Sequence, residues 1–97
     1  MNIETFKASL TETTPPDLPL ALQALWHEAN GDWNAAHDLL QNDNSDAGSW
    51  VHAYLHRKEG DAGNAAYWYR RAGQPVASDS FEAEWEAIAE NLLARTS

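Results

Sequence analysis

The sequence predicts an all-α chain in which two helical hairpins stack as a short α-α superhelix and a C-terminal helix caps the stack. Three observations support this: an internal repeat, apolar residues recurring at the spacing of helices, and one tryptophan in each of five expected helices. The repeat matches residues 24–27 to 53–56 and Gly31–Asp32 to Gly60–Asp61 at an offset of 29, then 34–36 to 64–66 at an offset of 30. The change of offset implies one inserted residue in the second copy.

The N-terminal segment, residues 1–16, has apolar residues at spacings of three and four, which predicts a short helix. A proline pair ends this segment, because proline disfavours helix at the residue before it. The first hairpin, residues 17–41, is expected to begin at an Asp17 N-cap and to turn at Asn30–Gly31. Asp32 then caps the second helix of this hairpin.

The second hairpin, residues 46–73, follows a polar loop rich in turn-forming residues. Its first helix is expected to end at Gly60, since glycine readily adopts the left-handed conformation that closes a helix. The last helix, residues 79–95, should start with a capping box made by Asp79 and Glu82. One apolar line and a polar outer face suit this helix to a terminal capping position.

A chain of 97 residues with 43% hydrophobic residues is expected to form a single all-α domain, residues 1–97, with one modest core. Large side chains at the expected helix contacts should fill this core. The residues expected to be largely buried are Trp50, Trp68, Trp85, Leu25, Leu39, Leu55 and Ile88.

The formal net charge of −9 argues against nucleic acid as a partner, because phosphate backbones repel a strongly acidic protein. No apolar run approaches the length of a membrane span, and the N-terminus does not resemble a signal peptide. The absence of cysteine excludes disulfides and thiolate metal sites. The expected location is the cytoplasm, with no cofactor.

Residues 66–72, AYWYRRA, resemble the A-x-W-Y-R-K-A end of a Sel1-like repeat. Ala53-Tyr54-Leu55, followed by Gly60–Asp61, is similar to the first-helix signature of the tetratricopeptide and Sel1-like helical repeat superfamily. The resemblance covers residues 18–73, although the period is shorter than the family's and only two copies are present. It implies a scaffold or peptide-binding module and no enzyme activity.

The leading function is therefore a non-catalytic protein-interaction module, with a monomer or weak homodimer as the expected state. First helices line the groove of a stacked array, so a peptide partner should meet His27, His52 and His56. His27 and His56 occupy equivalent repeat positions. A second contact face is expected on the outside of residues 63–72, where Tyr67, Arg70 and Arg71 could receive an acidic ligand.

Two alternatives belong to other functional classes. His52 and His56 are spaced i, i+4 with Glu59 one turn further on, an arrangement in which the three residues could hold a metal ion. The simpler interpretation of the same three residues is a solvated polar face. The other alternative is a structural homo-oligomer subunit. Catalysis has no support, because no serine lies in a nucleophile context and no glycine-rich phosphate loop is present.

Overall fold

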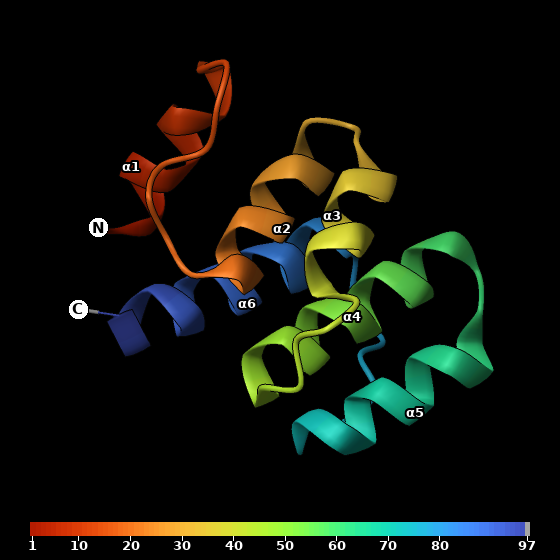
Figure 1. Ribbon diagram of the computed structural model, residues 1–97. Coiled ribbons are helices and arrows are strands. Elements are labelled where there is room, and N and C mark those ends of the chain that lie inside the picture. The colour runs from red at the N-terminus through yellow and green to blue at the C-terminus, as the bar shows by residue number, and fades with distance from the viewer. Residues whose placement is uncertain (97) are drawn as a thin grey trace.

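The computed structural model describes residues 1–96 and is helical throughout its regular elements, with no strand in that range (Figure 1). This confirms the all-α class. None of the described helices is both long and apolar enough to cross a membrane. The elements are α1 (Ile3–Ala8), the 3-10 helix η1 (Ser9–Thr11), α2 (Leu20–Ala29), α3 (Trp33–Leu40), α4 (Asp46–Glu59), α5 (Ala62–Ala72) and α6 (Phe81–Thr96).

The helices pair as two hairpins, α2 with α3 and α4 with α5, and α4 lies at the centre of the molecule (Figure 1). Helix α4 contacts α2, α3, α5 and α6, while α6 also contacts α1 and α2. The N-terminal segment packs on α6 through Phe6, whose ring stacks on that of Trp85 at 5.6 Å between centroids. Because α4 contacts four other helices, its residues 51–56 are all buried, and this decides the environment of the site described below.

Both hairpin turns have the same backbone chemistry. Gly31 and Gly60 have φ angles of 84° and 92°, which confirms the left-handed closure predicted at each. The aspartate after each glycine caps the next helix: Asp32 Oδ1 accepts from the Ala35 N–H at 3.0 Å, and Asp61 Oδ1 accepts from the Asn64 N–H at 3.2 Å. Each turn therefore ends one helix and begins the next within two residues.

The two hairpins match at an offset of 29 through their second helices as well. Buried Ala36 corresponds to buried Ala65, and buried Leu40 corresponds to buried Tyr69. The predicted shift to an offset of 30, with one inserted residue, is therefore wrong. The register is set by the capping aspartates and by the positions that face the partner helix. The sequence match Asn-Ala-Ala does not set it.

Two predicted N-caps are also wrong. Helix α2 begins at Leu20 with Pro19 before it, three residues after Asp17, because the residue preceding a proline is disfavoured in helical conformation. At the start of α6 the Ser80 hydroxyl accepts from the Ala83 N–H at 3.1 Å. Asp79 instead uses its backbone carbonyl to accept a hydrogen bond from Arg57.

The core lies between α2, α4 and α6. Leu25, Leu55 and Ile88 are fully buried and Trp85 is 8% exposed, as expected. The expectation is met only in part for the three others, because each packs against the edge of the core and is partly buried. They are Leu39, Trp50 and Trp68.

Candidate metal centre

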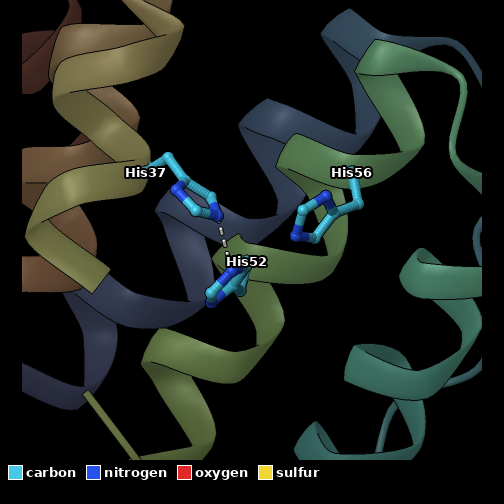
Figure 2. A group of neighbouring side chains, drawn as sticks. All are labelled: His37, His52 and His56. Carbon is cyan, nitrogen blue, oxygen red and sulfur yellow. Dashed lines mark hydrogen bonds between the residues drawn. The ribbon is translucent and has the colours of Figure 1, made fainter. Parts of the chain in front are cut away.

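Three histidines from two helices converge in the space between α3, α4 and α5 (Figure 2). His37 comes from α3, and His52 and His56 come from successive turns of α4. One ring nitrogen from each lies within 4.8 Å of the others. The Nε2 atoms of His37 and His52 are 3.1 Å apart, within hydrogen-bond distance. Imidazole nitrogens at this spacing can share a proton or bind one metal ion.

His52 and His56 are only 5% and 6% exposed, so the prediction that they form a solvated polar face is wrong. They do point away from the α2 side of α4. The side of α4 that carries the histidines is nevertheless covered, because α3 and α5 both pack against α4. A helical wheel for α4 alone cannot show this second layer of neighbours.

His56 is oriented by Glu59. Its Nδ1 donates a hydrogen bond to Glu59 Oε2 at 2.5 Å, so the lone pair of the neutral ring is on Nε2. Asn64 Nδ2 lies 3.5 Å from that Nε2. Glu59, predicted as a metal ligand, therefore accepts a hydrogen bond from His56 Nδ1. Carboxylates commonly orient metal-bound histidines in this way, through the ring nitrogen that does not bind the metal.

His52 is held in its neutral form. Burial, followed by the proximity of His37, His56 and Arg71, lowers the pKa of His52 from 6.5 to about 4. Its Nδ1 is buried with no hydrogen-bond partner. An unsatisfied buried polar atom costs about 1–3 kcal/mol, so the chain keeps this imidazole at the expense of stability.

Two tryptophans cover the cluster on opposite sides. Trp33 stacks on the His37 ring at 4.9 Å, and its indole N–H donates to the Leu55 carbonyl at 2.9 Å. Trp68 stacks on the His52 ring at 3.9 Å with an interplanar angle of 7°. These rings fix the orientation of the imidazoles and shield them from water.

Sequence reasoning identified part of this cluster. His27, grouped with His52 and His56 by the repeat, is outside it and packs instead against the edge of Trp26 at 5.1 Å. No motif marks His37, because it meets His52 only through the packing of α3 on α4. The one available signal was the concentration of three of the four histidines on two successive helices.

The outer face of α5 is exposed, as predicted. The Arg71 guanidinium lies over the rings of Tyr67 and Trp68, at 5.9 Å and 5.0 Å from their centroids. Within the described part of the chain neither Arg70 nor Arg71 forms an ion pair with a carboxylate. Arg95 on α6 also lacks a carboxylate partner among the described residues, but it is a single cation, whereas Arg70 and Arg71 lie side by side in the sequence and are both exposed.

Comparison with known proteins finds no matching family model, no matching curated protein and no matching solved structure. The resemblance to tetratricopeptide and Sel1-like repeats stays a prediction.

Proposed function

We propose that this protein is a non-catalytic binding module whose main ligand is a divalent transition-metal ion, held by His37, His52 and His56. The observation that carries the proposal is the convergence of three imidazole nitrogens within 4.8 Å in a buried position. Imidazole suits zinc, copper and nickel, and three histidines are a known ligand set for zinc. Glu59 would act from outside the ligand set, by orienting His56.

The distances fit such an ion closely. Zinc–nitrogen bonds of about 2.0–2.1 Å place two nitrogens of a tetrahedral site roughly 3.3 Å apart. The His37 and His52 Nε2 atoms are already 3.1 Å apart. His56 needs a shift of at most about 1.5 Å, because no pair in the cluster exceeds 4.8 Å.

The protonation states also suit metal binding. A metal ion requires neutral imidazoles, and its binding otherwise has to displace protons. The lowered pKa of His52, about 4, keeps this ring neutral at pH 7. The hydrogen bond from His56 Nδ1 to Glu59 directs the other nitrogen, Nε2, to the ion, which would displace only the long contact of 3.5 Å with Asn64 Nδ2.

The test is titration of untagged protein with Co²⁺ and Zn²⁺, followed by Co²⁺ absorption and by calorimetry. We expect a tetrahedral Co²⁺ spectrum that zinc abolishes. His37→Gln and His52→Gln should abolish this spectrum, and Glu59→Gln should weaken binding by about 10–100-fold. His27→Gln is the matched control and should bind normally. Binding that survives the first two changes would show that the ion binds elsewhere.

A second candidate function is contact with an acidic protein segment on the outer face of α5. It is favoured by the pairing of two exposed cations: Arg70 and Arg71 are neighbours without a carboxylate partner within residues 1–96, whereas Lys7, Arg57 and Lys58 each form an ion pair with a glutamate and the unpaired Arg95 stands alone on α6. The groove predicted from first-helix histidines has less support, because His52 and His56 are buried. The resemblance to peptide-binding repeats agrees with a contact role of this kind.

This second candidate is tested with an aspartate- and glutamate-rich peptide. Binding should weaken with rising salt and fall with Arg70→Glu. Arg95→Glu, which changes the same charge on α6, is the control and should have little effect. Equal loss in both variants would indicate only long-range attraction between net charges.

A further inference from the structure

A cavity of about 400 Å³ lies on the other side of α4 from the histidines, between the N-terminal segment, α2, α4 and α6. Leu10, Phe81 and Trp85 give it apolar walls, and Glu28 and Tyr54 contribute polar groups. Phe81 is 40% exposed, and the Arg57 guanidinium lies 4.7 Å from its ring centroid. An apolar cavity of this size with a few convergent polar groups is typical of a small-molecule site.

Glu28 is the most unusual residue in this cavity. It is 5% exposed and lies in the last turn of α2, where the helix dipole disfavours a negative charge. Tyr54 offers it only long hydrogen bonds, 3.4 Å to each carboxylate oxygen. Burial raises the pKa of Tyr54, so its hydroxyl remains a donor. A buried carboxylate in this position requires a cation.

The cation present is Lys58, which pairs with Glu28 from the end of α4. The Lys58 side chain is 42% exposed, so the lysine reaches the carboxylate from the solvent side. Glu28 keeps its cation if another ammonium takes the place of Lys58, whose flexible side chain can return its own ammonium to water. The lysine ammonium can therefore be exchanged for another ammonium at small cost.

The charges around the cavity favour such an exchange. Its wall holds two lysines and three glutamates, Lys7 and Lys58 with Glu28, Glu82 and Glu86, which gives a net charge of −1. Lys7 is already paired with Glu86 at 3.0 Å. With the chain at −9 overall, an anionic ligand is disfavoured and a cationic one is attracted.

We infer that this cavity binds a small organic amine, whose ammonium group replaces that of Lys58 on Glu28 while its apolar body packs between Phe81 and Trp85. Lys58 is then an internal competitor that occupies the site until the amine arrives. The inference is independent of the histidine cluster, because the two sites share no residue.

The experiment is calorimetric titration with three probes of one size: phenethylamine, phenylethanol and phenylacetate. We expect phenethylamine to bind at least about tenfold more tightly than the other two, since a charge-assisted hydrogen bond to Glu28 is lost with them. Glu28→Gln should remove that preference. Glu90→Gln, an exposed change on α6 outside the cavity, is the control.

Lys58→Met gives the decisive second measurement, because it keeps the apolar stem and removes the competing ammonium. It should strengthen phenethylamine binding several-fold, and because Glu28 then lacks its cation, the amine should also raise the melting temperature of this variant more than that of the wild type. Unchanged or weaker binding in Lys58→Met would overturn the inference, as would equal affinity for the three probes or no binding of the amine at millimolar concentration.

Discussion

The two hairpins have the same backbone and different environments. Each turns at a left-handed glycine, and each second helix starts at an aspartate cap. Helix α4 contacts α2, α3, α5 and α6, whereas α2 contacts α3, α4 and α6. His56 is therefore buried among aromatic rings, while its equivalent, His27, is only half-buried. Neighbouring helices, and not the repeat, decide what an equivalent side chain does.

Glu28 and Arg57 show the same effect with charge. They are equivalent at the offset of 29, yet each supports a different contact between elements. Arg57 donates to the buried carboxylate of Glu84 at 2.8 Å, and the Tyr69 hydroxyl donates to the same carboxylate. Glu28, at the end of α2, accepts from Lys58 on α4. The second hairpin places a cation where the helix dipole favours it, and the first places an anion where it does not.

The largest expected effect tests the structural register of the hairpins. Leu40→Ala should lower the free energy of unfolding by about 2–5 kcal/mol, because this side chain is fully buried at the position equivalent to Tyr69. Leu39→Ala should cost about 1 kcal/mol, since Leu39 is already partly exposed. Denaturant unfolding measures both, and the reverse order would restore the offset of 30.

The next effect is a loss of stability at low pH that should come from the second hairpin, through His52. In metal-free protein His52 has a pKa of about 4 when folded and 6.5 when unfolded, so the unfolded chain binds a proton first as pH falls. Stability should therefore drop between about pH 6.5 and 4, by on the order of 3 kcal/mol from this residue. His37, His56 and Arg71 face His52 and contribute to the shift.

The matching variant is His52→Gln, which copies the residue that the first hairpin has at the equivalent position, Gln23. Unfolding followed from pH 7.5 to 4 in chelator should show a flatter profile for this variant. His27→Gln should keep the wild-type slope. An identical slope in all three proteins would mean that His52 titrates normally in the folded state.

Replacing the turn glycine should have a smaller effect on stability, and the effect should be equal in the two hairpins. Gly31→Val and Gly60→Val should each cost about 1–2 kcal/mol, because both glycines are left-handed and a side chain there meets only backbone strain. Gly63→Ala, in a right-handed helical position with open space around it, should stabilise by about 0.5–1 kcal/mol. Thermal melts compare the three, and a clear inequality between the two valine variants would contradict the shared turn geometry.

The smallest effect concerns the caps. Asp32→Ala and Asp61→Ala should each cost about 1 kcal/mol by removing a hydrogen bond to a free helix N–H. Asp17→Ala and Asp79→Ala, at the two caps that the structure does not use, should stay within about 0.5 kcal/mol of wild type. Chemical denaturation gives the four values, and a large loss at Asp79 would place the α6 cap there.

The sequence by itself determined the local features of this protein. Left-handed glycines, aspartate caps and helical periodicity each act within a few residues, so the turns at Gly31 and Gly60 and the existence of the helices could be read directly. The failures at Asp17 and Asp79 were also local, because a proline and a neighbouring serine changed the cap. The offset of 29 between the second helices, α3 and α5, could not be predicted from the Asn-Ala-Ala match. It depends on which residues of each second helix pack against the first helix of the hairpin.

Only the tertiary structure decided the site. His37 and His52 are 15 residues apart and meet because α3 packs on α4, and Trp68 covers them because α5 packs on the other side. Burial then changes the chemistry of the same side chains, since an imidazole between helices loses its water and its proton. The spacing of His52 and His56 suggested a site, but the third histidine and the burial of the cluster depend on contacts between separate helices, which local patterns do not encode.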